Sequence, residues 1–468
     1  MYTIEFSKPV KIFFVGIGGI SMSGLAVILK RAGFDVSGSD RDRSDVTSFL
    51  ESEGIKVFYG QKKENITEDI DVIVLTAAIH KDNPEYVRME ELGIPHLSRA
   101  ELVGQLMRNY ETSIAISGTH GKTTTTSMIS EILLACTDAD PTISVGGMLP
   151  SIGGNIRVGG KKYFVTEACE YTNSFLNFFP DIALILNVEE DHMDFFKDLD
   201  DIRNSFKKFA QLVPKDGTVI ISSHIEDTGF FTDALDCKVL TFGLTDKDGK
   251  SGKAPDYTAA NTVIDAAGNA SFDVVLKGEK VSHVSLKVPG EHNILNALAA
   301  FAFADAVGVD REVASGALGR FGGTDRRFQK KGIIGDGVIL IDDYAHHPTE
   351  IKATMKAALS MEHRNLWVVF QPHTYSRTKA FFDDFADALS LADKVVLADI
   401  YAARETDDGS VSSEMLSEAI KKKNTDSYYF DSFEKIENFL MQNCQKGDVL
   451  ITMGAGDVYK IGDSLLER

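Results

Sequence analysis

Short, continuous apolar runs alternate with helical stretches along the whole chain. Residues 10–15 (VKIFFV) form the first run, and a glycine-rich turn and a helical segment near 20–32 follow it. Further short runs end near Gly38, cover 72–75 and lie near Pro95. Apolar runs of this length are typical of strands buried on both faces of a parallel sheet, with helices as the crossovers. The pattern therefore predicts a chain built from parallel α/β units.

Two breaks divide this pattern into three regions. Residues 98–108 are predicted to form a helix in which Ser98 is the N-cap and Glu101 completes a capping box. A polar stretch separates this helix from a new strand at 113–117, and a second break lies near Gly323. A chain of 468 residues is long enough for several domains. We predict three domains, at residues 1–109, 110–323 and 324–468.

The same patterns locate elements of the second and third regions. In the second region we predict strands at 163–165 and 182–186, a small antiparallel addition over 252–288, and a Pro289–Gly290 turn before a helix at 292–306. In the third region we predict strands at 338–341, 366–370, 394–397 and 449–451, and helices at 381–391 and 433–441.

The composition is that of an acidic globular protein. The formal net charge is −20 and the isoelectric point is about 5.0, which argues against binding to nucleic acid or to an anionic membrane surface, because both need a basic footprint. The four cysteines are far apart, so neither a disulfide framework nor a zinc site is expected. The first apolar run ends at once in glycines, and no run is long enough to span a bilayer. These features predict a cytoplasmic protein that binds neither membrane nor nucleic acid.

The strongest chemical signal is a glycine-rich loop between a predicted strand and a helix. Its glycines let backbone N–H groups approach phosphate oxygens, and Lys122 is placed to neutralise the β- and γ-phosphates. The hydroxyl of Thr123 is suited to holding Mg²⁺. The loop is shorter than the common GxxxxGK[ST] form, and the alternative is a glycine-rich helix start with a solvated lysine. The predicted phosphate-binding residues are Gly118, Thr119, His120, Gly121, Lys122, Thr123 and Thr124.

A second glycine-rich turn follows the first strand. Gly16, Gly18 and Gly19 are spaced as in a dinucleotide-binding fingerprint, but Ser21 takes the place of the third glycine. Asp40 follows at the end of a predicted strand, where a ribose-binding acid sits in such folds. The pattern indicates a nucleotide or pyrophosphate over a helix N-terminus, and the alternative is a tight turn. The residues expected to contact this ligand are Gly16, Gly18, Gly19, Ile20 and Ser21.

Acidic and histidine side chains follow two further strands. Glu167 comes after one strand, and the Asp191–His192 pair comes after the next. The C-terminal ends of parallel strands meet at one edge of a sheet. Thr123, Glu167 and His192 are therefore expected to meet around phosphates and Mg²⁺. The alternatives are a capping acid and a surface histidine.

Polar clusters also follow strands of the third region. DDYAHHP occupies 342–348 and QPHTYSR occupies 371–377, and two such clusters indicate an edge that faces a substrate. Arg326 and Arg327 lie at the entry to this region, where an arginine is able to reach a phosphate. The alternatives are a solvated linker and, for His347, a buried structural histidine.

Together these segments resemble those of the Mur ligase family. The matching segments are, in order, GIGGISMSGLA, GTHGKTTTT, EACE, NVEEDHMD, GEHNILNALAA, DRRF, DDYAHHPTE, QPHTYSRT and MGAGD, and they cover residues from about 10 to 460. The implied fold class is α/β with a Rossmann-like N-terminal domain, a P-loop ATPase-like central domain and a Rossmann-like C-terminal domain. The first, seventh and eighth segments are similar to those of the branch that adds L-alanine to UDP-N-acetylmuramate.

The resemblance implies a role for each candidate residue. Residues 118–124 would bind the phosphates of ATP, and the turn at 16–21 would bind the UDP pyrophosphate. Thr123 and Glu167 would hold one Mg²⁺ and His192 a second. The implied ATP contacts are Asn293 and Asn296 at the adenine, Asp343 at the ribose, and Arg327, with Arg326 as a second candidate, at the γ-phosphate. The implied substrate contacts are Tyr344, His346, His373 and Arg377, the last at the alanine carboxylate, and the implied catalytic residues are Lys122, His192, Arg327 and His346.

The implied reaction has two steps. The lactyl carboxylate of UDP-N-acetylmuramate attacks the γ-phosphate of ATP and forms an acyl phosphate, and the amine of L-alanine then displaces phosphate. Negative charge at both steps explains the need for Lys122, Mg²⁺ and arginine. The implied cofactors are ATP and Mg²⁺, and the implied state is a monomer or weak dimer. Two residues depart from the family pattern: Thr374 stands where some members carry arginine, and Cys169 where others carry an acid.

Three alternatives remain. A recycling ligase would attach a ready-made murein peptide to the same sugar nucleotide, but Tyr344 favours alanine addition because the recycling enzymes tend to have phenylalanine there. An NAD-dependent dehydrogenase would use the N-terminal region, and the phosphate-binding loop and the missing third glycine argue against it. A nucleotide-binding protein without turnover would not need Glu167, His192, Arg327 and His346.

Overall fold

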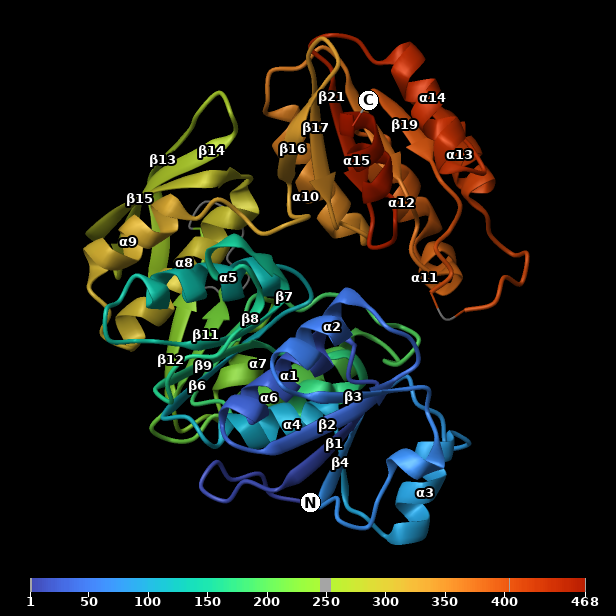
Figure 1. Ribbon diagram of the computed structural model, residues 1–468. Coiled ribbons are helices and arrows are strands. Elements are labelled where there is room, and N and C mark those ends of the chain that lie inside the picture. Colours follow the sequence, from blue (N-terminus) through green and yellow to red (C-terminus); the bar gives the residue numbers. More distant parts are fainter. Residues whose placement is uncertain (1, 245–253, 404, 468) are drawn as a thin grey trace. The chain divides into compact units, whose positions relative to one another are not determined.

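The computed structural model has the mixed α/β architecture that the apolar pattern predicts (Figure 1). It describes residues 2–244, 254–403 and 405–467. The chain divides into two compact units: unit 1 comprises Met1–Thr258 and Ala299–Ala314, and unit 2 comprises Ala259–Leu298 and Ser315–Arg468. Within the described ranges, no helix is long and apolar enough to cross a membrane.

Unit 1 begins with a parallel sheet in the strand order β3-β2-β1-β4-β5. Its strands are β1 (Lys11–Val15), β2 (Asp35–Asp40), β3 (Lys56–Tyr59), β4 (Val72–Leu75) and β5 (His96–Ser98). The connecting helices are α1 (Ile20–Arg31), α2 (Asp45–Ser52), the short η1 (Lys63–Asn65), α3 (Pro84–Leu92) and α4 (Arg99–Met107). The predicted strands and helices of this region are confirmed, and β2 continues past Gly38 to Asp40.

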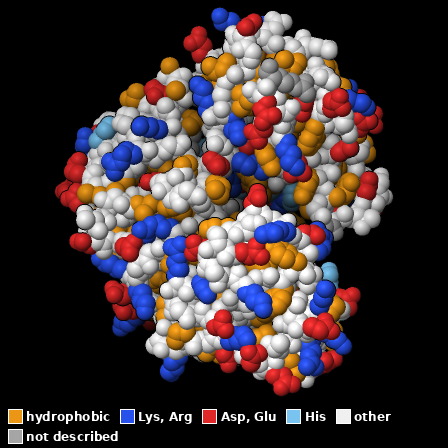
Figure 2. Space-filling model, viewed as in Figure 1, with side chains coloured by type: hydrophobic (Ala, Val, Ile, Leu, Met, Phe, Trp, Pro, Cys, Tyr) orange, Lys and Arg blue, Asp and Glu red, His pale blue; other side chains and the backbone are white. Residues whose placement is uncertain are grey.

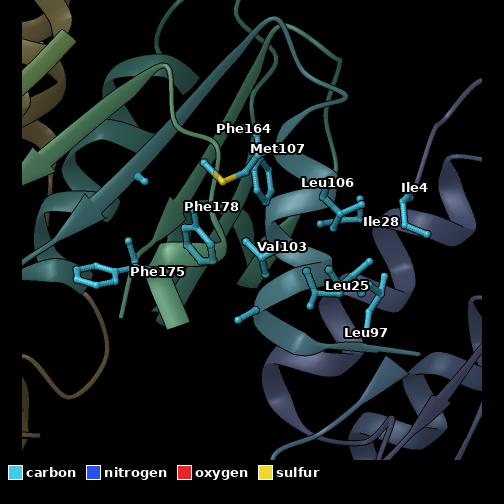
Figure 3. Close-up of a cluster of buried hydrophobic side chains, with 14 of the residues drawn as sticks. Ile4, Leu25, Ile28, Leu97, Val103, Leu106, Met107, Phe164, Phe175 and Phe178 are labelled. Atoms are coloured by element: carbon cyan, nitrogen blue, oxygen red, sulfur yellow. The ribbon is translucent and has the colours of Figure 1, made fainter. Parts of the chain in front are cut away.

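Helix α4 has the cap that its sequence predicts. The hydroxyl of Ser98 accepts a hydrogen bond from the backbone N–H of Glu101 (3.2 Å), and the Glu101 carboxylate accepts one from the N–H of Ser98 (2.7 Å). Figure 3 shows the apolar side of this helix inside a cluster of buried side chains, with Leu106 toward α1 and Met107 beside Phe164 of β9. A single apolar core therefore joins the first sheet to the strands that follow it.

The remaining strands of unit 1 belong to a second sheet, in which β6 lies between β10 and β9. Their order is β12-β11-β10-β6-β9-β7-β8, and every neighbouring pair is parallel except β7–β8. The bounds are β6 (Thr112–Ser117), β7 (Thr142–Leu149), β8 (Gly154–Arg157), β9 (Tyr163–Glu167), β10 (Ile182–Ile185), β11 (Thr218–Ser222) and β12 (Lys238–Phe242). The helices are α5 (Lys122–Leu134), η2 (Pro150–Ile152), η3 (Tyr171–Asn177), α6 (Leu199–Ala210) and α7 (Gly229–Thr232). Since β9, β6 and β10 are parallel neighbours, the segments that leave their C-terminal ends lie at one edge.

Three strands and two helices contribute to unit 2 before the third region. They are β13 (Tyr257–Ile264), β14 (Asn269–Leu276), β15 (Glu279–Pro289), α8 (Glu291–Ala306) and α9 (Arg311–Arg320), and the first residues of β13 and parts of both helices belong to unit 1. Strands β14 and β15 are antiparallel. The antiparallel addition predicted over 252–288 is confirmed where the structure describes it, and residues 252 and 253 lie outside the described residues.

The third region forms a sheet in the order β16-β17-β21-β18-β19-β20, parallel except for the β16–β17 pair. The strands are β16 (Gln329–Ile334), β17 (Val338–Asp343), β18 (Leu366–Phe370), β19 (Lys394–Leu397), β20 (Asp426–Tyr429) and β21 (Val449–Met453). The helices are α10 (Pro348–Leu359), α11 (Tyr375–Ala380), α12 (Phe382–Leu389), α13 (Ser413–Lys421), α14 (Phe433–Asn443) and α15 (Tyr459–Glu467). Helices α10, α12 and α13 pack on one core and α14 and α15 on another, so both faces of the sheet are covered.

The surface is mixed in charge. On the face shown in Figure 2, acidic and basic side chains are interspersed, and hydrophobic side chains occur in small groups among them. Such a mixture with a net charge of −20 is typical of a protein that stays dispersed in water.

Candidate active site

The phosphate-binding loop predicted from the sequence connects β6 to α5. Gly118 has a φ of 146°, and a Cβ atom there would lie 3.0 Å from the Leu186 side chain and 3.2 Å from the backbone of Asn187. Gly121 is the N-cap of α5 with a φ of 84°. Both glycines are needed, because any larger residue at 118 would meet the neighbouring chain and a positive φ strains other residues.

The segment after β10 holds this loop in place. The backbone N–H of His120 donates to the side-chain oxygen of Asn187 (2.7 Å), and the Asn187 amide donates back to the His120 carbonyl (3.0 Å). The Thr119 hydroxyl accepts a hydrogen bond from the N–H of Glu189 (2.9 Å). These bonds pre-organise the loop, whereas Thr124 lies half-buried in the first turn of α5.

Lys122 is folded back against its own loop. Its ammonium group donates to the carbonyl oxygens of Gly118 and Thr119 and to both carboxylate oxygens of Glu170, at 3.0 and 3.2 Å. Burial acts to lower the pKa of Lys122, but the Glu170 carboxylate outweighs this effect and raises the pKa above its usual value. The side chain of Glu170 is only 3% exposed, so Lys122 is held as a cation by a buried partner.

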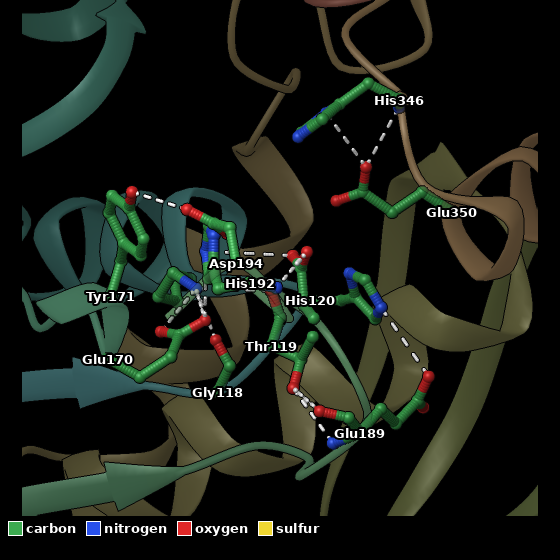
Figure 4. Close-up of polar contacts among 12 residues, drawn as sticks. Gly118, Thr119, His120, Glu170, Tyr171, Glu189, His192, Asp194, His346 and Glu350 are labelled. Atoms are coloured by element: carbon green, nitrogen blue, oxygen red, sulfur yellow. Dashed lines mark hydrogen bonds and ion pairs between the residues drawn. The ribbon is translucent and has the colours of Figure 1, made fainter. Parts of the chain in front are cut away.

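Glu170 also lies beside His192. The Nε2 atom of His192 is 3.8 Å from a Glu170 oxygen and 3.8 Å from a carboxylate oxygen of Asp191. The ring stacks on Tyr171, with 4.5 Å between the ring centroids, and the backbone of His192 has a φ of 54° (Figure 4). A non-glycine residue in this conformation is held by its surroundings, and one of the neighbours of His192, Glu170, is also the partner of Lys122.

Glu167 and Thr123 both border β7. The Glu167 carboxylate accepts a hydrogen bond from the N–H of Gly146 (2.5 Å), and a Cβ atom at Gly146 would lie 2.9 Å from either carboxylate oxygen. A Cβ atom at Gly147 would lie 3.2 Å from the methyl group of Thr123. The two predicted metal ligands therefore face one short segment. Among the described residues, however, no group of three or more His, Cys, Asp or Glu side chains is arranged to hold a metal ion.

In the N-terminal glycine turn, the carboxylate of Asp40 contacts the backbone of the chain itself. Asp40 accepts a hydrogen bond from the N–H of Gly18 (2.8 Å) and another from the N–H of Arg41 (2.8 Å). A Cβ atom at Gly16 would lie 2.6 Å from Thr76, so this glycine allows close packing of the turn. Asp40 thus braces the turn itself. The other predicted ligand contacts are Gly19, which is the N-cap of α1, Ile20, which is 66% exposed, and Ser21, which accepts a hydrogen bond from Arg99 (3.2 Å).

In unit 2 the two neighbouring arginines differ in how firmly the protein holds them. The guanidinium of Arg326 donates to Asp342 (3.0 Å) and to the carbonyl of Gly454 (2.7 Å), and it lies between the rings of Tyr344 and Tyr459. These contacts tie Arg326 into the C-terminal sheet. Arg327 is less enclosed, with a side chain 29% exposed. The structure therefore favours Arg327 over Arg326 as the phosphate contact.

Asp343 is more enclosed than a ribose contact would require. One carboxylate oxygen accepts a hydrogen bond from the N–H of Ala345 (2.7 Å), and the other accepts from the N–H of Phe328 (2.9 Å) and the hydroxyl of Thr354 (3.2 Å). Burial raises the pKa of Asp343 to about 6, although Arg327 opposes this shift. Asp343 fastens the chain after the arginines to the end of β17.

Three aromatic residues of the predicted substrate edge lie together. The ring of His346 contacts those of Tyr344 (5.5 Å between centroids) and His373 (5.9 Å), and His373 stacks on Tyr401 (5.5 Å). Burial, with the nearby His346 and Arg377, lowers the pKa of His373 to about 4, so this ring is neutral at pH 7. The Nδ1 atom of His373 is buried and has no hydrogen-bond partner among the residues that the structure describes.

The predicted adenine contacts are confirmed as neighbours on one face of α8. The amide of Asn296 donates to the side-chain oxygen of Asn293 (3.1 Å), and the Asn293 amide donates to the carbonyl of Pro289 (2.7 Å). Both side chains are buried. Their contact with adenine stays a prediction.

Three family models match the chain in order. They are the catalytic domain of the Mur ligase family at residues 11–111, the Mur ligase middle domain at 116–304 and the glutamate ligase domain of Mur ligases at 326–456. The chain belongs to the Mur ligase family. This result confirms the α/β fold class with three Mur ligase domains.

Curated Mur ligases match over the full length. The chain is 56% identical to the UDP-N-acetylmuramate–L-alanine ligase of Lachnospira eligens, and the match covers 100% of both chains. It is 54% identical to the enzyme of the same name from Agathobacter rectalis, again over 100% of both. Identity this high over whole chains leaves no domain of these relatives unmatched.

Solved Mur ligase structures share the fold. A UDP-N-acetylmuramate–alanine ligase from Thermotoga maritima is 31% identical, covers 98% of each chain and has a TM-score of 0.79. A murein peptide ligase from Psychrobacter arcticus is 25% identical, with the same coverage and a TM-score of 0.68.

Glu170 was not among the Mur ligase site residues predicted from the sequence. The EACE segment contains two glutamates, and only Glu167 was assigned a role. The second glutamate lies three residues further on, which places it where the chain turns away from β9. A second carboxylate in that segment was the only signal, and it gave no indication that the partner is Lys122.

Proposed function

We propose that this chain joins L-alanine to the lactyl carboxylate of UDP-N-acetylmuramate in an ATP-dependent step of peptidoglycan precursor synthesis. The observation that carries the proposal is the 56% identity to the Lachnospira eligens enzyme of that name over both full chains. The loop after β6 supports this proposal. Backbone N–H groups at the start of α5 and a largely buried, cationic lysine are able to bind the phosphates of a nucleoside triphosphate.

In the proposed reaction, the lactyl carboxylate attacks the γ-phosphate and an acyl phosphate forms. Lys122 neutralises the phosphate oxygens, and Arg327 adds a second positive charge as the bond to ADP breaks. The amine of L-alanine then attacks the acyl carbon, and phosphate leaves. We assign His346, Tyr344, His373 and Arg377 to the amino acid and the sugar carboxylate.

We propose Mg²⁺ as the metal, with Thr123 and Glu167 as the protein ligands of one ion and His192 as the protein ligand of a second. Magnesium is usually bound by one or two carboxylates together with phosphate oxygens and water. Thr123 and Glu167 supply the oxygen donors and face the same segment of β7. His192 is a less usual donor for this metal, and the Glu170 oxygens beside it are more typical ones. The metal would supply charge neutralisation at the phosphates.

We propose domain boundaries at 1–109, 110–323 and 324–468. The limits of the three family models, 11–111, 116–304 and 326–456, support these boundaries. We also propose a cytoplasmic location and a monomer or weak dimer as the working state.

The test is phosphate release from ATP in the presence of Mg²⁺ and UDP-N-acetylmuramate, measured with single amino acids and with the cell-wall tripeptide. We expect release that depends on both the sugar nucleotide and L-alanine. Release with the tripeptide alone would assign the chain to the recycling ligases instead. No release with any amine would contradict a ligase activity.

A further inference from the structure

Glu350 connects two candidate catalytic side chains of unit 2. It lies in the first turn of α10, and its Oε2 atom accepts a hydrogen bond from the backbone N–H of His346 (3.1 Å). The same oxygen is 3.2 Å from Nδ1 of the His346 ring, and Oε1 is 3.7 Å from the guanidinium of Arg327. The Glu350 side chain is 13% exposed, so these contacts are largely shielded from water.

The surroundings of Nδ1 determine where the ring hydrogen of His346 lies. Nδ1 is 3.2 Å from the Glu350 carboxylate and 3.0 Å from the carbonyl oxygen of Tyr344. A carbonyl oxygen never donates a hydrogen bond, and neither does a carboxylate. The neutral ring must therefore carry its hydrogen on Nδ1, and Nε2 carries the lone pair. Figure 4 shows Nε2 directed away from Glu350.

The other groups around His346 leave this arrangement intact. The Tyr344 ring packs edge-on against it, and the neutral His373 ring lies 5.9 Å away. The positive charges near the cluster belong to Arg326 and Arg327, which both lie over the Tyr344 ring, and to Arg377, which acts on His373. Glu350 is thus the carboxylate placed to orient His346 and to stabilise a proton gained at Nε2.

We propose that Glu350 is a positioning residue that fixes His346 as the Nδ1–H tautomer, so that Nε2 accepts a proton from the ammonium group of the amino-acid substrate. This inference rests on the proposed function. Nε2 takes one proton, and the freed nitrogen lone pair forms the bond to the acyl carbon. The C–O bond to phosphate breaks, phosphate leaves with that electron pair, and the second proton on nitrogen passes to water.

The tautomer is measured directly by ¹⁵N NMR of histidine-labelled protein, with His346→Gln identifying the signal. We expect wild type to show a protonated Nδ1 and an unprotonated Nε2 at His346. In Glu350→Gln the side-chain amide is able to donate to Nδ1, so the population should shift toward the Nε2–H form. Glu434→Gln, which changes an exposed glutamate in the first turn of α14, is the matched control and should leave the signal unchanged.

Kinetics provide the second readout. Glu350→Gln is expected to lower kcat about 100-fold at saturating L-alanine. A wild-type Nε2–H tautomer, or a Glu350→Gln protein with unchanged tautomer and kcat, overturns the inference. A wild type that releases no phosphate with any amine overturns the proposed function instead, and the NMR measurement still decides the tautomer.

Discussion

At the scale of single residues, the ion pair between Lys122 and Glu170 dominates the phosphate-binding loop. Both side chains are largely buried, with 16% and 3% exposed. A buried charge is costly unless its partner stays in place, so removing one partner destabilises a protein more than replacing both. In the proposed reaction the same lysine also contacts phosphate. The ion pair is therefore expected to affect both the stability of the fold and the activity.

Lys122→Met is expected to lower both activity and stability. Phosphate release should fall at least about 100-fold, because a charge aimed at the transferring phosphate is lost. The free energy of unfolding should fall by roughly 3 kcal/mol, because Glu170 is left buried without its partner. Steady-state kinetics and urea unfolding measure the two effects.

The double variant Lys122→Met/Glu170→Gln separates the loss of activity from the loss of stability. It removes both charges, so we expect most of the lost stability to return while activity stays low. If the double variant is as unstable as Lys122→Met alone, the buried carboxylate is not the cause of the destabilisation.

His373 is expected to make stability depend on pH on the acid side. Its pKa is lowered to about 4 in the folded chain from an ordinary value of 6.5, so the unfolded chain takes up the proton first as pH falls. The stability that this residue contributes is complete above about pH 6.5 and is lost as pH falls toward 4. We expect the difference in unfolding free energy between wild type and His373→Phe to shrink over that range in urea titrations. A difference that stays constant with pH would contradict the shift.

At the scale of elements, the contact of α4 with η3 depends on one small residue. A Cβ atom at Gly104 would lie 1.9 Å from the carbonyl oxygen of Asn177, which is backbone and is unable to move aside easily. The glycine is therefore kept inside a helix although alanine is the better helix former by about 1 kcal/mol. Close packing between two elements decides this position.

Gly104→Ala is expected to lower the free energy of unfolding by roughly 1–3 kcal/mol, because the added methyl group overpacks the contact. Gly316→Ala in α9 is the matched control: the nearest atom to its added Cβ would be the flexible end of Arg320 at 3.3 Å. We expect that control to be neutral or stabilising by up to about 1 kcal/mol. Thermal unfolding monitored by circular dichroism distinguishes the two outcomes.

At the scale of the whole molecule, each compact unit contains apolar cores of its own. The only tryptophan of the chain, Trp367, is buried in β18 of unit 2 and donates to Asp448 (3.0 Å). Its fluorescence therefore reports on unit 2, whereas far-UV circular dichroism reports on all helices and strands. Chains with separate cores commonly unfold in more than one step.

We expect the fluorescence and circular dichroism transitions in urea to differ. ATP with Mg²⁺ at about 100 times its Kd should stabilise the folded chain by roughly 2.7 kcal/mol. The residues assigned to ATP belong both to unit 1, at 118–124, and to unit 2, at Asn293, Asn296, Arg327 and Asp343, so the nucleotide should shift both curves. Coincident curves with and without nucleotide would instead indicate one cooperative unit.

The local features of this protein follow directly from its amino-acid sequence. The strand–loop–helix at 112–134, the capping box of α4 and the order of the α/β elements depend on residues that are neighbours in the chain. Glycines with positive φ, a serine cap and short apolar runs act over a few residues. For that reason the phosphate-binding loop and the fold class could be predicted, as could the position of Asn293 and Asn296 on one face of a helix.

Which side chains meet depends on contacts between segments that are distant in the chain. Arg326 and Arg327 are adjacent and chemically identical, yet Arg326 donates a hydrogen bond to Asp342 at 3.0 Å, whereas Arg327 lies 3.7 Å from its carboxylate partner Glu350. Lys122 and Glu170 are 48 residues apart, and nothing in the sequence pairs them. A sequence pattern gives each residue's chemistry, but burial, orientation and partner depend on packing between distant segments, and those three set the charge and the role of a side chain.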